Sequence, residues 1–490
     1  MPIRNLIYCC VFENRDYLKL AKLLVNSINI NCSLDDSTDV LVMTHPSYEE
    51  ELLRTVKLSH KNLLTYTLEK SSLFEAGCAR LDIFSYPHID KYDKILYVDT
   101  DILFEDTPAR LFNLDISDNK IYVYPEGIVS DPYHGKSYWD LKGLDPQTPA
   151  FTSGTLFFRN SETMRALFTD IKKHIHEDVH INNGYIPGCL DQPFIVYTTV
   201  INNLHDGSIL PSHIKNLGYE NYNGKIISSR FKPAERHVLY HFFGGLGDFN
   251  NKYQRMTDFM ATHFIKPPMF DKEEITLQFE EKRPTFESHL ECLECIIRST
   301  GATLEGNSVY YHQSLNRFQE LLPKQINLFW AGLTATTRIC EIGFNAGHSA
   351  LLMLLGRPKT PVNFTIFDIG EHAYVKPTME YIVRQFPYVL FDYTPGDSTQ
   401  IIPSWIASHP LVEGTYDVVH VDGGHSYHCI TNDMKNAAVL VRIGGILIVD
   451  DVYIGYINDT VNQYISTGHF REVACLPTVG YTHRIIQRVI

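Results

Sequence analysis

Two aspartates separated by one residue, Asp99 and Asp101, follow an apolar stretch within DKILYVDTDILFEDTP (residues 93–108). Side chains two positions apart on a strand point the same way, so both carboxylates would lie together where the strand ends. Charges at the edge of an apolar core are costly without a partner. A divalent cation is a suitable partner, because it takes carboxylate oxygens and leaves positions for a diphosphate. The tripeptide alone is also compatible with a turn that carries two solvated acids.

Four further polar residues of the first half could act on the same ligand. Arg80 lies in an expected helix just before the strand of Asp99, where a guanidinium could bind a diphosphate through two hydrogen bonds. Asp191 and Gln192 begin another expected helix, with a proline in its first turn. His241 interrupts an apolar strand before several glycines, so it could bind a cation while the backbone approaches a phosphate. The alternatives are a surface arginine and a structural histidine.

The second half contains a glycine turn between an expected strand and an expected helix, in RICEIGFNAGHSA (residues 338–350). Gly343 and Gly347 would let the backbone and the helix N-terminus approach a ligand. Asp368 ends the next expected strand, where a carboxylate can accept hydrogen bonds from ribose hydroxyls. The spacing is G-x-x-x-G rather than G-x-G-x-x-G, and Glu341 precedes the first glycine. Both features argue against NAD as the ligand.

The elements that position these residues follow from the hydrophobic pattern. Strands and helices alternate in both halves, which predicts α/β sheets with ligands at the C-terminal ends of the strands. A charged, proline-containing stretch separates the halves and is typical of a domain boundary. The expected domains are residues 1–265 and 286–490, joined by a linker over residues 266–285 that contains a short β-like stretch.

Composition limits the classes of function. The 490 residues are enough for two or three domains, and 44% hydrophobic with 20% charged residues fits soluble globular domains. The net charge of −14 argues against broad nucleic-acid binding. Ten scattered cysteines are typical of reduced intracellular thiols, and no window reaches the ~18 apolar residues of a membrane span. A cytoplasmic protein is therefore expected; the sequence does not indicate its oligomeric state.

The first half resembles glycosyltransferase family eight, which includes glycogenin and lipopolysaccharide galactosyltransferases, over about residues 5–250. The resemblance rests on RLDIFSYPHIDKYDKILYVDTDILF, a later Ser-Gly before a strand, the Asp-Gln pair and the H-F-x-G ending. It implies the GT-A fold, manganese held by Asp99, Asp101 and His241, and a nucleotide-sugar diphosphate on the metal. It also implies that Arg80 binds the donor.

Asp191 and Gln192 match the Asp-Gln pair that lies beside the attacked sugar carbon in this family, and the family retains the anomeric configuration. A neutral glutamine is a poor nucleophile, so front-face displacement is favoured over a covalent intermediate. The leaving diphosphate gains negative charge, which a cation and Arg80 would stabilise.

Two positions depart from the family pattern. Gly247-Asp248-Phe249 stands where the motif H-x-x-G-x-x-K-P-W has K-P-W, whose lysine usually contacts a phosphate. Thr152 stands where asparagine is common. The resemblance therefore leaves open the donor sugar and its nucleotide.

The second half closely resembles class I S-adenosylmethionine-dependent sugar O-methyltransferases of the macrocin and novobiocin type, over about residues 310–490. The resemblance rests on ICEIGFNAGHSALLML, YDVVHVDGGHSYHCITNDM and IGGILIVDDV. The residues implied to bind S-adenosylmethionine are Glu341, Gly343, Gly347, Asp368 and Asp397. Of these, Asp397 would lie near the adenine. Asn345 replaces the middle glycine that is common in the motif.

In the metal-dependent branch of that family, an aspartate after the fourth strand and an Asp-Asp pair after the fifth bind magnesium. Asp422, Asp450 and Asp451 match these ligands. Three carboxylates from neighbouring strand ends would repel one another without a cation. Magnesium could hold two vicinal sugar oxygens and lower the pKa of one hydroxyl, whose proton His425 could accept. The alternatives are a solvated Asp-Asp turn and a helix-start histidine that moves no proton.

These motifs predict a bifunctional enzyme of glycan synthesis. The first domain would transfer a hexosyl or deoxyhexosyl group from a nucleotide-diphosphate sugar to a glycan or sugar acceptor, and the second would methylate a sugar hydroxyl. Fused chains of this kind occur in large DNA viruses and in bacterial glycan clusters, so a viral chain would act in the host cytoplasm. Two alternatives remain: the first domain is an inactive glycan-binding module, or the methyltransferase acts on a non-sugar small molecule.

Overall fold

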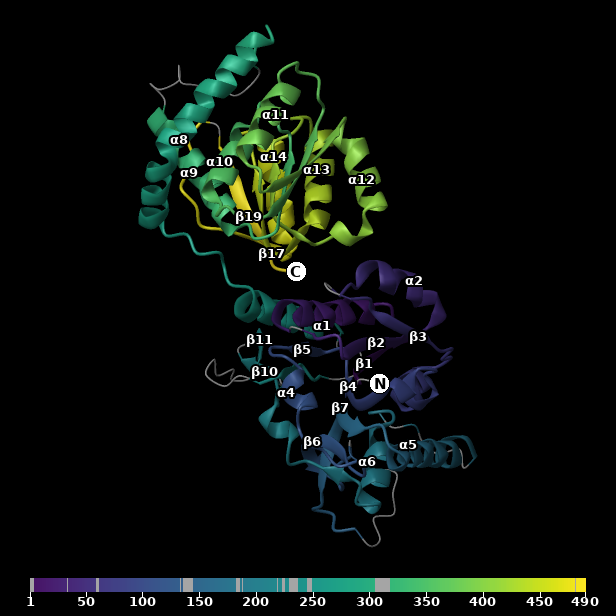
Figure 1. Cartoon of the computed structure of the whole chain (residues 1–490). Helices are drawn as coiled ribbons and strands as arrows, with labels where there is room; N and C mark the ends of the chain where they lie inside the picture. Colours follow the sequence, from purple (N-terminus) through teal and green to yellow (C-terminus); the bar gives the residue numbers. More distant parts are fainter. Residues whose placement is uncertain are drawn as a thin grey trace. The chain divides into compact units, whose positions relative to one another are not determined.

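The computed structural model describes residues 4–490 except 33, 59–60, 133, 135–143, 182–185, 187, 218, 223–224, 229–236, 245–248, 305–317 and 481. The chain separates into two compact units, Met1–Phe264 and Ile265–Ile490 (Figure 1). Each unit contains a sheet with helices on both faces, which confirms the predicted α/β class. Gly247 and Asp248, where the sequence departs from the K-P-W motif, lie outside the described residues.

The first unit is built on a seven-stranded sheet in the order β3-β2-β1-β4-β7-β6-β8. Its strands are β1 (Arg4–Val11), β2 (Thr38–Thr44), β3 (Leu64–Thr67), β4 (Tyr92–Val98), β6 (Ile121–Ile128), β7 (Pro149–Arg159) and β8 (His205–Asp206). Strands β3, β2, β1 and β4 are parallel, and β7 is antiparallel to β4 and β6. The apolar runs of β1 and β4 are typical of strands buried on both faces. Their C-terminal ends share one edge of the sheet.

A smaller sheet continues from that edge. Its strands β5 (Ile102–Phe104), β12 (Leu239–His241) and β9 (Ile214–Asn216) are arranged in the order β5-β12-β9. Strand β12 is antiparallel to β5, with His241 opposite Ile102. Since β5 begins directly after Asp101, this pairing brings a distant histidine to the acid pair. A hairpin, β10 (Tyr219–Tyr222) and β11 (Lys225–Ser228), completes the strands described here.

The helices of the first unit cover both faces of its large sheet. They are α1 (Tyr17–Asn31), α2 (Pro46–Thr55), α3 (Leu73–Gly77), α4 (Ala109–Phe112), α5 (Glu162–Ile175), α6 (Gln192–Ile201) and α7 (Phe249–Phe259). Successive residues of β1 belong to opposite cores: Leu6 packs in the core that includes α5 and α6, and Ile7 in the core that includes α1. The residue predicted to bind the donor, Arg80, lies in a 3₁₀ segment, η1 (Cys78–Ser85).

The second unit has a seven-stranded sheet in the order β15-β14-β13-β16-β17-β19-β18. Its strands are β13 (Arg338–Ile342), β14 (Val362–Asp368), β15 (Val389–Pro395), β16 (Tyr416–Val421), β17 (Val441–Val449), β18 (Phe470–Glu472) and β19 (Arg484–Arg488). The strands from β15 to β17 are parallel, and β19 is antiparallel to β17. The strand order reverses between β13 and β16, and such a point is where ligands bind in open α/β sheets.

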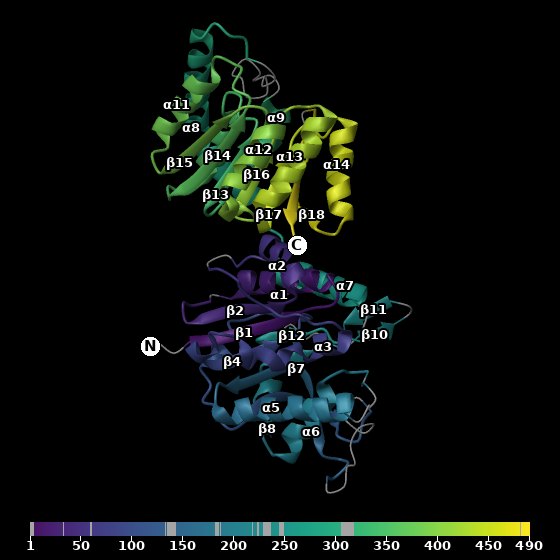
Figure 2. The same ribbon diagram turned by 90° about the vertical axis from the view of Figure 1, so that its right-hand side faces the viewer.

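Helices cover both faces of this sheet as well. They are α8 (Lys272–Ser299), α9 (Phe318–Thr334), α10 (His348–Gly356), α11 (Val375–Gln385), α12 (Ser398–Ser408), α13 (Tyr427–Leu440) and α14 (Gly455–Ser466). Figure 2 shows α12, α13 and α14 side by side along the sheet. Val418 of β16 packs in the core with α8 to α11, and its neighbour Val419 packs in the core with α12 to α14. Among the described helices, none is long and apolar enough to cross a membrane.

Helix α8 corrects the expected linker. Residues 272–285 are its first half, and the predicted β-like stretch is helical. The Asp271 carboxylate caps the helix by accepting from the backbone N–H groups of Glu273 (3.1 Å) and Glu274 (3.0 Å). Ile275 and Phe279 are one turn apart and are both buried in the core of the second unit. The alternating apolar pattern indicated a strand, but the cap and this packing favour a helix.

Candidate active sites

The acid pair of the first unit lies in the turn between β4 and β5. The backbone N–H of Asp99 donates to the carbonyl of Gly154 at 2.9 Å, which fixes the turn against β7. The imidazole Nε2 of His241 lies 3.3 Å from Asp101 Oδ1. One ligand atom from each of Asp99, Asp101 and His241 lies within 4.8 Å of the other two. The structure therefore brings together the three residues that the resemblance implies as manganese ligands.

Three observations fit a divalent cation at this cluster. A Cβ on Gly154 would lie 3.0 Å from Asp99 Oδ2 and from His241 Cε1, so glycine leaves the space between the ligands open. Asp101 Oδ1 is buried and, within the described chain, accepts no well-formed hydrogen bond. The Nδ1 of His241 lies 3.2 Å from Asn216 Oδ1, and donation there leaves the Nε2 lone pair toward the carboxylates. Carboxylate oxygens and an imidazole suit manganese.

Lys252 of α7 was missed by the sequence reasoning and contacts this cluster directly. Its ammonium Nζ lies 2.6 Å from Asp101 Oδ2, and 15% of its side chain is exposed. Burial raises the pKa of Asp101, but Lys252 and His241 outweigh burial, so the pKa lies well below its ordinary value. No motif marks this lysine, because its position depends on the packing of α7.

Arg80 is buried between two acids. Its Nε lies 3.0 Å from Asp191 Oδ2 and its Nη1 lies 3.3 Å from Asp99 Oδ1, while Nη1 donates to the carbonyl of Ser153 at 2.7 Å. The guanidinium carbon lies 4.7 Å from the centre of the Tyr97 ring, and the Tyr97 hydroxyl donates to Asp99. Arg80 therefore links the Asp99 turn to the start of α6, in addition to its predicted role toward a diphosphate.

The predicted Asp191-Gln192 pair lies at the start of α6. Asp191 is fully buried, and burial raises its pKa to about 6 although Arg80 lowers it. The side-chain oxygen of Gln192 accepts from the backbone N–H of Ser153 at 2.9 Å, which holds the amide beside the β7 strand. Thr152, the position where asparagine was expected, accepts from the backbone N–H of Gly154 at 3.2 Å. These contacts place Asp191 and Gln192 near the Asp99 turn.

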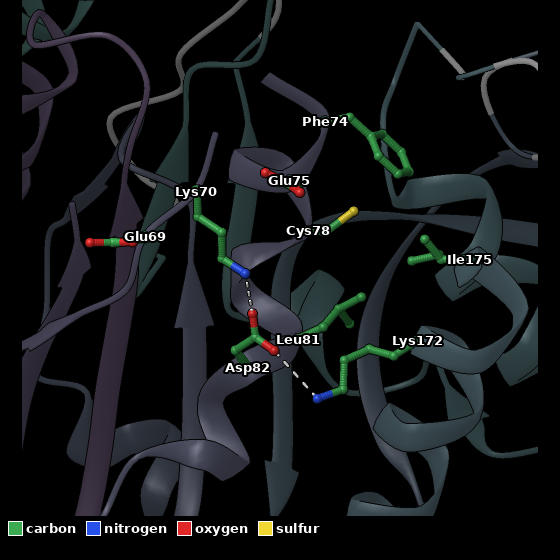
Figure 3. A pocket seen from close by; sticks show the side chains of 9 residues that line it. All are labelled: Glu69, Lys70, Phe74, Glu75, Cys78, Leu81, Asp82, Lys172 and Ile175. Atoms are coloured by element: carbon green, nitrogen blue, oxygen red, sulfur yellow. Dashed lines mark hydrogen bonds and ion pairs between the residues drawn. The ribbon is translucent and has the colours of Figure 1, made fainter. Parts of the chain in front are cut away.

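A hollow of about 190 Å³ lies beside η1 and is lined by residues that include Phe74, Cys78 and Asp82. Figure 3 shows Asp82 between two lysines, with Lys70 at 2.6 Å and Lys172 at 3.3 Å. None of the predicted site residues lines this hollow. The ion pair of Asp82 with Lys172 ties η1, the segment that carries Arg80, to α5.

The glycine turn of the second unit follows β13. Gly343 has φ +91°, and a Cβ there would lie 1.9 Å from the backbone oxygen of Asp422, so only glycine fits. Gly347 has φ +80° and precedes α10. Asp368 Oδ2 accepts from the backbone N–H groups of Phe344 and Asn345, both at 2.8 Å. Asp368, predicted to bind ribose, thus also holds the turn in place.

The other two predicted cofactor residues differ in their surroundings. Glu341 is fully buried, and its Oε1 accepts from Ser349 Oγ at 2.6 Å and lies 2.9 Å from His420 Nδ1. Its Oε2 has no hydrogen-bond partner within the described chain. Asp397 is exposed and caps α12 by accepting from the backbone N–H of Thr399 at 2.9 Å. Glu341 lies at the C-terminal end of β13 and Asp397 follows β15, so both are at the same edge of the sheet as the glycine turn.

The three aspartates predicted to bind magnesium form two overlapping groups rather than one. Asp422 groups with His420 and Asp450, and separately with His425 and Asp451, with ligand atoms within 4.8 Å in each group. Burial and the neighbouring Asp450 raise the pKa of Asp422 well above its ordinary value. That crowding of acids fits a cation at Asp422, the residue common to both groups.

Lys324 of α9 lies on the deeper side of these acids. Its buried ammonium contacts Asp450 Oδ2, and Asp450 Oδ1 accepts from the backbone N–H of Asp451 at 2.9 Å. Both carboxylate oxygens of Asp450 therefore have a partner already: the Lys324 ammonium and the backbone N–H of Asp451. A cation that used Asp450, as the sequence predicts, would have to share it with this ammonium. The sequence reasoning missed Lys324 because it lies 126 positions before Asp450 in the sequence, so no local pattern connects the two residues.

His425 lies on the exposed side. Its Nε2 lies 2.7 Å from Asp451 Oδ2, and 61% of its side chain is exposed. The hydrogen bond to Asp451 raises the pKa of His425 despite partial burial. The Tyr456 hydroxyl donates to the backbone carbonyl of His425, and the Tyr456 ring packs edge-on against Tyr427. An exposed imidazole with one nitrogen hydrogen-bonded to a carboxylate can accept a proton from a bound hydroxyl on its other nitrogen.

Two family models match the chain. Residues 14–196 match glycosyl transferase family 8, and residues 340–452 match a methyltransferase domain. Both resemblances seen in the sequence are thereby confirmed at the level of the domain. No curated protein matches the chain.

The solved structures that match parts of the chain include several glycosyltransferases. The apo bifunctional glycosyltransferase WbbM is 15% identical, with 54% of this chain and 50% of WbbM covered and a TM-score of 0.37. The galactosyltransferase LgtC, in complex with donor and acceptor sugar analogs, is 14% identical, with 51% and 95% covered and a TM-score of 0.35. Apo GlyE of Streptococcus pneumoniae TIGR4 is 10% identical, with 89% of each chain covered and a TM-score of 0.34. The match to WbbM spans about half of its length.

Proposed function

We propose that this chain, which carries a glycosyltransferase family 8 domain and a methyltransferase domain, transfers a sugar from a nucleotide-diphosphate donor and methylates a sugar hydroxyl. The observation that carries the proposal is that each unit gathers carboxylates and histidines at the C-terminal edge of its parallel strands. Such edges are where open α/β sheets bind their ligands.

For glycosyl transfer, manganese would be held by Asp99, Asp101 and His241. When bound, it stabilises the negative charge that develops on the leaving diphosphate. The side-chain oxygen of Gln192 accepts from a backbone N–H, so the amide is held in position but is a poor nucleophile. Attack by the acceptor hydroxyl on the face that the diphosphate leaves would retain the anomeric configuration. The buried Arg80 adds positive charge beside the Asp99 turn.

For methyl transfer, S-adenosylmethionine would bind at the turn of Gly343 and Gly347 and supplies an electrophilic methyl group. Magnesium would be held at Asp422 with Asp450 or Asp451. His425 accepts the hydroxyl proton on its open side, and Asp451 holds the imidazole and stabilises its protonated form. The substrate hydroxyl would approach from the exposed side of His425.

Two assays on the full chain test the proposal. The first measures release of nucleoside diphosphate from uridine and guanosine diphosphate sugars with manganese. Asp101→Asn should lose most of this release, whereas Asp16→Asn, at an exposed acid of the same unit, should not. The second measures methyl transfer to a panel of glycosides. Here His425→Ala should lose turnover and the exposed neighbour His428→Ala should retain it.

The outcomes separate this proposal from its two alternatives. A glycan-binding module without transferase activity would bind glycan but release no nucleoside diphosphate from any donor. A methyltransferase for non-sugar substrates would turn over small alcohols or catechols and leave every glycoside unmethylated. The intact cluster of Asp99, Asp101 and His241 supports an active first domain.

A further inference from the structure

The ammonium of Lys252 contacts the second carboxylate oxygen of Asp101, a residue that the proposed manganese site would use. Its Nζ lies 2.6 Å from Asp101 Oδ2, and the other oxygen of Asp101 lies 3.3 Å from His241 Nε2. Asp101 is buried and Lys252 is mostly shielded from solvent, since 6% and 15% of their side chains are exposed. Charges at this depth interact strongly because water screens them little.

A divalent cation and this ammonium cannot both stay close to Asp101 without strong repulsion. The cation would reach Asp99, Asp101 and His241 together, because their ligand atoms lie within 4.8 Å of one another. It would then lie within a few ångströms of the position that the ammonium holds. A lysine can relieve this repulsion, because its ammonium sits on a flexible four-carbon stem. Arg80 could not, since its guanidinium is fixed by Asp191, Asp99 and Ser153.

We propose that Lys252 is an exchangeable counter-ion, which neutralises Asp101 while the site holds no divalent cation and turns to the donor's diphosphate once the cation displaces it. This role rests on the proposed function of the first unit. A diphosphate bound on the cation places new negative charge next to the displaced ammonium. The ion pair lost at Asp101 is then replaced by one with a phosphate oxygen.

The exchange has a thermodynamic consequence. Without nucleotide, a cation must break the Lys252–Asp101 ion pair and leaves the ammonium without an anion, so it binds weakly. With a nucleoside diphosphate present, the ammonium gains a new partner. Cation and diphosphate should therefore strengthen each other's binding reciprocally. Removal of the ammonium should raise the affinity for the cation alone and weaken the binding of the diphosphate.

Calorimetry on the full chain tests this role, with manganese alone and with manganese plus uridine or guanosine diphosphate. In the wild type, diphosphate should tighten manganese binding about tenfold or more. Lys252→Met should bind manganese alone about tenfold more tightly, bind the diphosphate more weakly and lose most of the coupling. Lys252→Arg keeps the charge and should keep manganese binding weak. Lys19→Met, at an exposed lysine paired with Asp16, should behave as the wild type.

Several results would overturn the role of Lys252. An unchanged or lower manganese affinity in folded Lys252→Met would exclude competition for Asp101. Unchanged diphosphate binding in Lys252→Met would show that the displaced ammonium does not contact the diphosphate. The mutual strengthening of manganese and diphosphate binding can be measured in the wild type alone. Its absence there would also refute the exchange. If the wild type bound neither manganese nor nucleoside diphosphate, the proposed glycosyl transfer would fail together with this role.

Discussion

Three of the five described non-glycine residues with positive φ lie beside the candidate sites. These are Leu190, Asn345 and Asp451, with φ values of 57°, 50° and 57°; the other two are Glu13 and Asn203. Leu190 precedes Asp191, Asn345 lies in the glycine turn, and Asp451 holds His425. Such conformations cost about 1–3 kcal/mol each and persist where the surrounding contacts enforce them. The strain agrees with a functional requirement for the positions of the neighbouring side chains.

Asp433 of α13 gives a prediction on pH. The residue is 1% exposed, and neither carboxylate oxygen has a well-formed hydrogen bond within the described chain. Burial raises its pKa to about 6, although the Ser398 hydroxyl lowers it somewhat. The folded state therefore binds the proton more tightly than the unfolded state. This contribution to stability is complete below the unfolded pKa of about 4 and is lost as the pH rises through about 6.

Asp433→Asn removes this titration. A shift of two pKa units corresponds to about 3 kcal/mol, so the variant should be more stable than the wild type at pH 8 by up to that amount. At pH 4 the two should be nearly equal. Urea unfolding of the second unit at both values measures the difference. Asp459→Asn, at an exposed acid of α14, is the control. If the wild type and Asp433→Asn differed by the same free energy of unfolding at both pH values, the raised pKa of Asp433 would be contradicted.

The ion pair of Lys324 and Asp450 gives a prediction on stability. Both side chains are buried, and removal of one partner leaves an uncompensated charge, which typically costs about 3–5 kcal/mol. Lys324→Met should therefore destabilise the second unit by that amount. The double variant Lys324→Met/Asp450→Asn should recover most of the loss, because no charge is left unpaired. Chemical unfolding of the three proteins tests this, and a double variant as unstable as Lys324→Met would contradict it.

At the scale of elements, the sequence predicted what depends on local pattern. The helix expected to begin at Asp191 and Gln192 is confirmed as α6, with Asp191 at its N-cap and a proline in its first turn. Acids were also predicted correctly at the ends of β4, β14, β16 and β17, because an apolar run determines where a buried strand stops.

Contacts between residues distant in sequence could not be predicted. Lys252 and Lys324 reach Asp101 and Asp450 only after α7 and α9 have packed, and a lone lysine carries no local signal for this. The β-like stretch predicted within residues 266–285, which is helical in α8, was wrong for the same reason. Its alternating apolar residues fit a strand, and its burial against the second unit, which decides the outcome, is a tertiary effect.

Helix α8 gives a prediction on domain boundaries. The sequence places the start of the second domain at residue 286, but Ile275 and Phe279 are buried in its core, and Trp330 Nε1 donates to the carbonyl of Met269 at 3.0 Å. A fragment of residues 265–490 should fold and bind S-adenosylmethionine. A fragment of residues 286–490 loses these contacts and should be several kcal/mol less stable, since each large buried side chain contributes about 2–5 kcal/mol. Thermal melts of the two fragments compare them directly. Equal melting temperatures would show that the first half of α8 is dispensable.

At the scale of the whole molecule, the two activities should be separable. Each unit has its own sheet, two hydrophobic cores and a cluster of acids and histidines drawn entirely from within that unit. Asp101→Asn should reduce release of nucleoside diphosphate by roughly a hundredfold, the scale reached when a group that stabilises developing charge is removed. Methyl transfer by the same protein should be unchanged. Asp422→Asn should have the converse effect, because Asp422 belongs to both groups of the second unit and to none of the first.

The same argument extends to fragments. Residues 1–264 and 265–490, expressed separately, should each keep the activity assigned to that unit, with rates on small soluble substrates within a few-fold of those of the full chain. Both rates would be measured under the same conditions with manganese, magnesium and S-adenosylmethionine present. A single substitution that lowered both activities, or a fragment that folded but was inactive until the other was added, would mean that a site needs residues from both units. The division of function between the two sheets would then be wrong, although the geometry within each sheet would be unaffected.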